Sequence, residues 1–262
     1  MTTLGGHLFV CRGLKLDYCF LEATESLLPV CDQVAVTLFS DEDLEAFKEK
    51  FPNEPKIILV KKEEKDFDGM PGKERLNWWT NFTRDQLSTD WQFCLQSDEI
   101  LHEDSYAAVR QTIEKPIAEA YAVRRFNLWG DCYHYLNYPK IIAAGRHGHL
   151  PCSEYVGRLA LLKYNSCGDA ESLDAPFNWD YKDAIRTYHM GFVRDKKKKS
   201  DHIIHIQEKV FDLGFHDPRT DDDIRENNGE FRPYKRFSKD ELLPISENLP
   251  KVIQKWAEAR NK

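Results

Sequence analysis

Apolar residues in the first hundred positions form short continuous runs separated by amphipathic segments. The runs are rich in β-branched and aromatic residues and predict buried strands at residues 8–11, 34–39, 56–60 and 91–96. Between them, apolar positions spaced three and four apart predict helices at residues 17–28, 40–50 and 74–87. Continuously apolar strands that alternate with helices are typical of a parallel sheet covered on both faces. The pattern therefore predicts an α/β fold.

The alternation is weaker after residue 103. Further elements are predicted as a helix at 105–114, strands at 120–126, 158–163 and 185–193, and a helix at 200–213. The polar residues 216–235 predict a long loop, and a capping box at 238–241 precedes an amphipathic segment at 244–262. We expect one domain over residues 1–215, on which residues 216–262 pack as a C-terminal loop and helix extension.

Composition narrows the class of protein. The 262 residues include no apolar run of about eighteen, so no membrane span is expected, and the N-terminus lacks the basic region of a signal peptide. Seven cysteines without a CxxC pair suit reduced thiols in a cytoplasm. The net charge of -7 disfavours a dedicated nucleic-acid-binding module, although a local basic groove can coexist with it. We expect a cytoplasmic globular protein.

The most informative stretch lies where the strand at 91–96 ends. After this strand and Ser97 come Asp98 and Glu99, and then His102 and Glu103. Open α/β sheets bind ligands at the carboxyl ends of their strands, and carboxylate oxygens there suit a hard divalent cation and, through it, a diphosphate. The alternative is that Asp98 caps a helix that follows, since Asp is a favoured N-cap residue.

Two further positions at strand ends carry similar alternatives. Residues 40–43, Ser-Asp-Glu-Asp, follow the second strand, where an acidic side chain could accept the ring N–H of a nucleobase; they also form a capping box with Ser40 as N-cap and Asp43 at its third position. His189 ends a later strand and is followed by the small Gly191. Its imidazole could complete a cation site begun by Asp98, or it could be a hydrogen-bonded structural histidine.

Two loops complete the candidate chemistry. The lysine run at 196–199 follows the His189 strand and could stabilise a leaving diphosphate, or could be a solvated loop. Asp169 lies in a turn of small residues and could accept a proton from an incoming hydroxyl group, although Asp is also common in such turns for conformational reasons.

Five short blocks, taken in order, resemble a family 2-type glycosyltransferase of the GT-A fold, in a bacterial and phage subgroup. They are the first strand and helix over residues 12–32, the segment 81–91, the block 95–103 that looks like a DXD motif, and the later blocks 168–170 and 188–194. The resemblance covers roughly residues 8–200. It implies a Rossmann-like, mostly parallel central sheet with helices on both faces and a C-terminal helical elaboration.

Carried over by position, the resemblance assigns roles to single residues. Asp98 becomes the metal-binding second acidic residue of DXD, with His189 as a further ligand. The nucleotide-binding set becomes Arg12, Ser40, Asp41, Asp43 and Gln96. A phosphate-binding set follows the His189 strand, namely Arg194, Lys196 and Lys197, and the general base becomes Asp169 or Glu171. Gln96 departs from the motif, because an amide replaces the first Asp and brings no charge to a metal ion.

The expected activity is transfer of a sugar from a nucleotide sugar, with UDP the favoured nucleotide, to an acceptor hydroxyl, assisted by Mn²⁺ or Mg²⁺ and with inversion. The acceptor is a saccharide or, alternatively, hydroxymethylated pyrimidine in DNA, in a bacterial or phage-infected cell. The DNA alternative would use a basic groove of residues 194–199, Arg232, Lys235 and Arg236. A sugar or a flipped base could stack on Trp129, Tyr133, Tyr135 or Tyr138, although an aromatic core is the commoner explanation for such residues. A non-catalytic nucleotide-sugar or glycan-binding domain is the alternative from another class, favoured by Gln96.

Overall fold

A computed structural model of the chain describes residues 1–67, 70, 72–139, 154–167, 172–174, 180–193, 241–245 and 248–260. The helices are α1 (Phe20–Leu27), α2 (Asp41–Lys50), α3 (Gly72–Arg84), α4 (Tyr106–Glu114) and α8 (Lys251–Arg260), with short 3₁₀ turns η1 (Glu64–Phe67) and η2 (Glu103–Ser105). The strands are β1 (Leu4–Val10), β2 (Gln33–Leu38), β3 (Ile57–Lys61), β4 (Trp91–Cys94), β5 (Glu99–Leu101), β6 (Ala120–Trp129), β7 (His134–Leu136), β8 (Tyr155–Leu161), β9 (Ser166–Cys167), β10 (Ser172–Leu173), β11 (Asp180–Phe192) and β12 (Leu242–Pro244).

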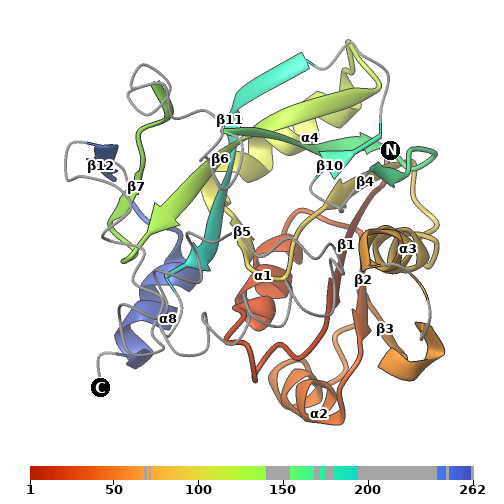
Figure 1. The fold of residues 1–262 in the computed structure, drawn as a ribbon. Coiled ribbons are helices and arrows are strands. Elements are labelled where there is room, and N and C mark those ends of the chain that lie inside the picture. Colours follow the sequence, from red (N-terminus) through yellow and green to blue (C-terminus); the bar gives the residue numbers. More distant parts are fainter. Residues whose placement is uncertain are drawn as a thin grey trace.

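One large sheet organises the molecule (Figure 1), with strand order β12-β7-β6-β8-β4-β1-β2-β3. Strands β4, β1, β2 and β3 are all parallel. Strand β8 lies antiparallel between β4 and β6, and β11 runs parallel to β6 while pairing antiparallel with the short β5. The expected α/β fold with a mostly parallel central sheet is confirmed, and its second half is of mixed direction.

Helices cover both faces of the parallel half, as two neighbouring glycines show. A Cβ on Gly5 would lie 2.7 Å from Leu87, which follows α3, whereas a Cβ on Gly6 would lie 3.0 Å from Leu27 at the end of α1. Successive residues of a strand point to opposite faces, so α3 and α1 lie on opposite sides of β1. The close approach of both helices explains why β1 carries two residues without side chains.

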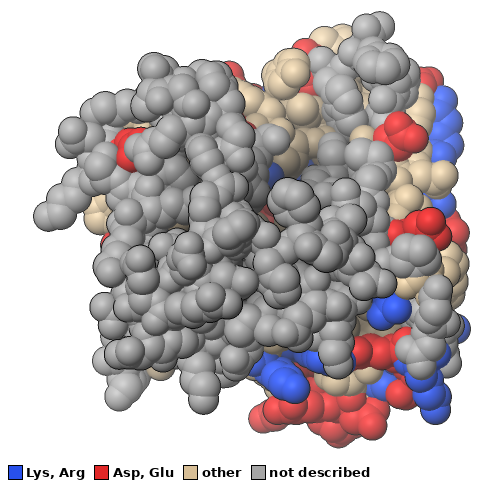
Figure 2. All heavy atoms as spheres, in the orientation of Figure 1, with Lys and Arg blue, Asp and Glu red and all other residues tan. Residues whose placement is uncertain are grey.

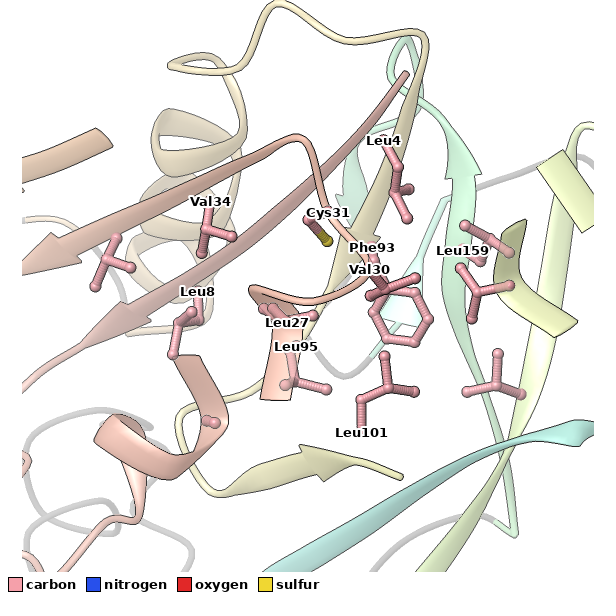
Figure 3. Close-up of a cluster of buried hydrophobic side chains, with 14 of the residues drawn as sticks. Leu4, Leu8, Leu27, Val30, Cys31, Val34, Phe93, Leu95, Leu101 and Leu159 are labelled. Atoms are coloured by element: carbon pink, nitrogen blue, oxygen red, sulfur yellow. The ribbon is translucent and has the colours of Figure 1, made fainter. Parts of the chain in front are cut away.

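The main core fills the space between α1 and the sheet (Figure 3). Buried side chains come from β1, β2, β4 and β8, and they meet the end of α1 and the turn after it: Leu4, Leu8, Leu27, Val30, Cys31, Val34, Phe93 and Leu159. Leu95 and Leu101 enter the same core from either side of residues 96–100. Full burial of one such side chain contributes about 1.5–3 kcal/mol, so the core holds both ends of that segment in place.

Helix α2 shows how local signals fix an element. The hydroxyl of Ser40 accepts a hydrogen bond from the Asp43 backbone N–H at 3.2 Å, which makes Ser40 the N-cap. The first turn is acidic and the last turn carries Lys48 and Lys50, an arrangement that complements the helix dipole. Acidic side chains gather around α2 at the lower end of the molecule, where they are coloured red in Figure 2.

The C-terminal helix α8 packs on the first half of the chain. Ile253 and Leu249 join a buried cluster with Cys19 before α1, Ile100 in β5 and Tyr188 in β11. No helix among the described residues has the length and apolar character needed to cross a bilayer. The predicted helix at 200–213 and loop at 216–235 lie outside the described residues, and the division of the chain at residue 215 stays a prediction.

Several boundaries differ from the prediction for identifiable reasons. Strand β1 begins at Leu4 rather than residue 8, because Gly5, Gly6 and His7 interrupt the apolar run although they are buried. The first helix begins at Phe20 rather than residue 17, after a loop in which Arg12 and Asp17 adopt positive φ angles of 57° and 62°. No helix directly follows Asp98, so the prediction that Asp98 caps one is wrong: the strand β5 follows it instead.

Candidate functional site

Three candidate segments meet at one edge of the sheet. Arg12 follows β1, residues 40–43 follow β2, and Gln96 and Asp98 follow β4. Because β4, β1 and β2 are adjacent and parallel, their carboxyl ends lie side by side, and each segment that leaves them begins at the same edge. This is the edge at which open α/β sheets bind ligands.

Asp98 and His189 are brought together by the pairing of β5 with β11. In that antiparallel pair His189 lies opposite Glu99, and the Met190 backbone N–H donates to the Asp98 carbonyl oxygen at 2.7 Å. The His189 Nε2 atom lies 3.6 Å from Asp98 Oδ2, and both residues are buried. Two residues separated by ninety positions in the sequence thus present an imidazole nitrogen and a carboxylate oxygen to the same point.

The donor set suits a divalent cation. An imidazole and a carboxylate are both common ligands of Mn²⁺-like ions, and a nitrogen and an oxygen that share an ion at about 2.1 Å lie roughly 3–4 Å apart. The separation of 3.6 Å between His189 Nε2 and Asp98 Oδ2 is within that range. Within the described part of the chain, no group of three or more His, Cys, Asp or Glu side chains is gathered for a metal ion. The pair therefore offers two protein ligands.

Gly191 leaves room beside this pair. A Cβ at that position would lie 2.5 Å from Cε1 and 2.6 Å from Nε2 of His189, and 3.2 Å from Oδ2 of Asp98. Carbon atoms are not tolerated at such distances from a ring, so any side chain at Gly191 would force the imidazole to turn away. The absence of a side chain is a steric condition for the observed position of His189.

Gln96 closes the turn that carries Asp98. The Glu99 backbone N–H donates to the Gln96 carbonyl oxygen at 3.1 Å, and the Gln96 backbone N–H donates to Glu99 Oε2 at 3.3 Å. Gln96 is half-buried and precedes Asp98 by two residues. Its amide can donate or accept hydrogen bonds but adds no charge to the Asp98–His189 pair.

Beneath the turn, Glu99 is fully buried and is held by two arginines. Arg158 on β8 donates from Nε to Oε2 and from a terminal nitrogen to Oε1, both at 2.8 Å, and Arg125 on β6 donates to Oε1 at 3.1 Å. Burial alone would raise the pKa of Glu99, but the two guanidinium groups outweigh it and lower that pKa to about 2. Glu99 is therefore a carboxylate at all physiological pH values.

The side chains of Ser40, Asp41 and Asp43, which follow β2, form hydrogen bonds or ion pairs within the protein. Asp43 is buried, and its two carboxylate oxygens accept the backbone N–H groups of Gly13 and Leu14, each at 2.8 Å. Ser40 caps α2. Asp41 is exposed and forms an ion pair with Lys61 at 3.2 Å. Asp43, one of the residues predicted to contact a nucleoside, thus holds the loop after β1.

Arg12 lies on that loop and is fixed by an acidic partner. Its Nε and a terminal nitrogen donate to the two oxygens of Glu64, at 2.8 and 2.7 Å, in a bidentate ion pair. The pair links the end of β1 to the 3₁₀ turn that follows β3. Arg12 therefore lies at the predicted edge, with its guanidinium oriented before any ligand arrives.

Other predicted site residues lie outside the described residues. They are the candidate bases Asp169 and Glu171, the phosphate-binding Arg194, Lys196 and Lys197, and the basic groove residues Lys198, Lys199, Arg232, Lys235 and Arg236. Of the aromatic residues considered for stacking, Trp129 and Tyr138 are buried in a cluster with Leu136. Tyr133 is exposed.

Sequence reasoning missed the roles of Arg125, Arg158 and Glu99. Arg125 lies inside the strand predicted at 120–126, and Arg158 begins the strand predicted at 158–163, which β8 (Tyr155–Leu161) replaces in the structure. An arginine in an otherwise apolar run was the signal that the sequence offered. A charge inside such a strand requires a buried partner. The identity of the partner was not readable, because Glu99 lies 26 residues from Arg125 and 59 from Arg158.

Comparison with known proteins gives similarity at low identity. No protein-family model matches the sequence, and no curated protein is significantly similar to it. The chain is similar in structure to S. aureus TarS 1–349, with 12% identity over 83% of this chain and 68% of that chain and a TM-score of 0.45. It spans 44% of a longer TarS structure.

Two further solved structures are similar to this chain. Glucosyl-3-phosphoglycerate synthase from Mycobacterium tuberculosis, in complex with Mn²⁺, UDP and glucosyl-3-phosphoglycerate, has 14% identity over 80% of this chain and 67% of that chain, with a TM-score of 0.40. The galactosyltransferase LgtC, in complex with donor and acceptor sugar analogs, has 10% identity over 47% and 46%, with a TM-score of 0.31. Because these values are low, we base the function on the residues of this chain.

Proposed function

We propose that the protein is a glycosyltransferase that moves a sugar from a nucleotide sugar to an acceptor hydroxyl group, with a divalent cation held by Asp98 and His189. The observation that carries the proposal is the 3.6 Å approach of His189 Nε2 to Asp98 Oδ2 at the carboxyl edge of the parallel strands. Order and spacing of the sequence blocks that resemble family 2-type enzymes support the same reaction.

Each residue of the pair has a defined task. Asp98 supplies a charged oxygen, and His189 supplies a neutral ring nitrogen whose orientation is set by the β5–β11 ladder. A cation bound there supplies charge that neutralises the diphosphate and makes it a better leaving group. Gln96 borders the same site and would donate a hydrogen bond to ribose or phosphate oxygens. Gly191 keeps the approach to both ligands open.

The nucleoside would lie along the ends of β1 and β2. Asp43 holds the loop of residues 11–18 through Gly13 and Leu14, so nucleoside contacts come from that loop, from the ordered Arg12, and from Ser40 and Asp41 at the start of α2. Asp169, or Glu171, would remove the proton from the acceptor hydroxyl as the hydroxyl attacks the anomeric carbon with inversion. Such general-base assistance contributes roughly 10²–10⁴-fold to a rate.

The test is a thermal-shift screen of nucleoside diphosphates and UDP-sugars with and without MnCl₂. A ligand at a hundred times its Kd stabilises a protein by about 2.7 kcal/mol, which for a chain of this size raises Tm by roughly 5–10 °C. We expect one nucleotide to give this shift with Mn²⁺ and to give little without it. Asp98→Asn should abolish the Mn²⁺-dependent part.

The matched control is Glu45→Gln, which removes an exposed carboxylate on α2 that pairs with Lys48 of the same helix. It should leave the shift unchanged. A Mn²⁺-dependent shift without sugar transfer or nucleotide-sugar hydrolysis would favour a non-catalytic binding domain, the reading that Gln96 supports. A wild-type protein stabilised by none of these nucleotides would contradict the transferase proposal.

Two classes of acceptor are considered, and the salt dependence of acceptor binding distinguishes them. Binding of DNA that contains hydroxymethylated pyrimidine would weaken steeply with added salt, because phosphate contacts release counterions. Binding of a neutral saccharide would change little over the same range. Transfer assays with both acceptors at 50 and 200 mM salt therefore assign the acceptor class.

A further inference from the structure

The group beneath the candidate cation site is a buried triad of one carboxylate and two guanidinium groups. Glu99, Arg125 and Arg158 are exposed by 0%, 2% and 0%, and they come from three different strands, β5, β6 and β8. Arg158 holds both carboxylate oxygens of Glu99, and Arg125 holds one of them. The Glu99 carboxyl group is thereby fixed against the sheet in one orientation.

The Glu99 carboxylate is also hydrogen-bonded to the turn that carries Asp98. Its Oε2 atom accepts the Gln96 backbone N–H at 3.3 Å, while the Glu99 backbone N–H returns to the Gln96 carbonyl oxygen at 3.1 Å. Residues 96–99 are thus closed by one bond from the side chain and one from the main chain. Asp98 lies between these two closures, and its own carbonyl oxygen is held by Met190 next to His189.

Stability alone does not explain a triad of this kind. Desolvation of three charged groups is costly, and replacing buried ion pairs or triads by apolar residues of similar volume is often neutral or stabilising. Besides its two arginine partners, the Glu99 carboxylate accepts the Gln96 backbone N–H, in the turn that presents Asp98 to His189. We therefore expect that the triad, whose desolvation lowers stability, serves to place the metal ligands Asp98 and His189 accurately.

We propose that Glu99, clamped by Arg125 and Arg158, is a positioning residue that sets the 96–99 turn so that Asp98 and His189 converge on one cation. The inference rests on the proposed function, because it assumes that the pair binds a divalent ion with a nucleoside diphosphate. Groups that orient metal ligands typically contribute 10–100-fold to metal affinity. The triad should act on affinity without touching the ligand itself.

The decisive variant replaces the whole triad by apolar residues, Glu99→Met, Arg125→Met and Arg158→Met, so that no buried charge is left without a partner. Folding is followed by circular dichroism and thermal unfolding. Binding of Mn²⁺ is followed by electron paramagnetic resonance, and binding of UDP with Mn²⁺ by calorimetry. We expect a folded protein whose affinity for Mn²⁺ and UDP together is at least tenfold weaker than that of wild type.

A milder variant covers the case in which the triple replacement does not fold. Arg125→Gln removes the 3.1 Å bond from Arg125 to Glu99 and leaves the bidentate Glu99–Arg158 pair as a neutral unit. We expect about threefold to tenfold weaker binding of Mn²⁺ with UDP at an unchanged folded fraction. Wild-type affinity in either folded variant overturns the inference, and so does an Arg125→Gln protein that fails to fold, because the triad would then have a structural role.

Failure of the inference is distinguishable from failure of the proposed function. If wild type binds Mn²⁺ with UDP and Asp98→Asn does not, the cation site stands whatever the triad variants show. If wild type binds neither Mn²⁺ nor UDP, the proposed function itself is wrong. The positioning role alone is rejected when the first result is followed by unchanged binding in a folded triad variant, or by an Arg125→Gln protein that fails to fold.

Discussion

At Gly191, a single missing side chain determines whether His189 can face Asp98. We predict that Gly191→Ala turns the imidazole out of its position, because the new Cβ would lie 2.5 Å from Cε1 of the ring. Overpacking of this kind costs about 1–3 kcal/mol of stability. Affinity for Mn²⁺ in the presence of UDP should fall at least tenfold, as measured by calorimetry at a temperature where the variant is fully folded.

Gly6→Ala separates the steric cost from the effect on the site. Its Cβ would lie 3.0 Å from Cys31 and Leu27 in the main core, away from the candidate site, so it should lower Tm without changing Mn²⁺ affinity. If Gly191→Ala keeps the wild-type affinity, the imidazole is not held as a ligand, and the role proposed for His189 is wrong.

Among the elements, the loop of residues 11–18 is ordered by a side chain from helix α2, Asp43. We predict that Asp43→Ala releases this loop, because Gly13 and Leu14 lose their acceptor. Hydrogen bonds to charged groups contribute about 1.5–3 kcal/mol each, so the variant should be clearly less stable. Amide hydrogen exchange over residues 12–18 should become faster, and affinity for UDP with Mn²⁺ should fall.

Asp41→Asn is the matched control for this change. It lies on the same helix but is exposed, and its ion pair with Lys61 is of the surface type that contributes about 0–1 kcal/mol. Exchange over residues 12–18 should match that of wild type in this control. Slow exchange of the same amides in Asp43→Ala would show that the loop is held by other contacts.

The elements differ in how far sequence could predict them. Strands β1 to β4 and helices α1 to α3 were predicted to within a few residues, the strands from short apolar runs and the helices from apolar positions spaced three and four apart. Strand β5 was missed because three residues, Glu99 to Leu101, carry no period of their own. It is a strand only because β11, some ninety residues later, pairs with it.

For the molecule as a whole, the position of the candidate site at the strand ends could be predicted from the sequence, but the buried triad of Glu99, Arg125 and Arg158 could not. Asp98 and His189 were named from strand ends and from resemblance, both of which are local in the sequence. The triad beneath them depends on opposite charges that meet only in three dimensions, between residues on β5, β6 and β8. Such pairing follows no spacing rule in the sequence, because the partners are brought together by the order of the strands in the sheet.

A buried histidine makes the stability of the whole molecule depend on pH. His7 lies in the centre of β1, and its Nε2 atom is 3.0 Å from Oε1 of Gln92. Gln92 donates its own amide hydrogens to the carbonyl oxygens of Leu161 and Tyr164, so it can only accept from His7. Burial disfavours the imidazolium form and lowers the pKa of His7 from 6.5 to about 4, although the Gln92 bond opposes the change.

This pKa fixes the direction of the effect. Between pH 4 and 6.5 the unfolded chain binds a proton at His7 that the folded protein does not, so the contribution of His7 makes the free energy of unfolding rise with pH across this window and changes no further above it. At about 1.4 kcal/mol per pH unit, His7 should lower the free energy of unfolding, relative to neutral pH, by about 2 kcal/mol at pH 5 and by about 3 kcal/mol near pH 4.

His7→Gln tests this dependence, because the amide keeps a donor to Gln92 and cannot titrate. Urea unfolding at pH 7.5 gives the difference in unfolding free energy between variant and wild type when His7 is neutral in both states. At pH 5 the wild type alone is also destabilised by protonation of His7 in the unfolded chain, so the difference is smaller. We expect the variant to gain about 2 kcal/mol relative to wild type between the two pH values. Unfolding free energies that stay parallel from pH 7.5 to pH 5 would mean that His7 does not titrate in the unfolding equilibrium. Glu99, whose pKa lies near 2, contributes mainly below pH 4.5, so it does not mask the result.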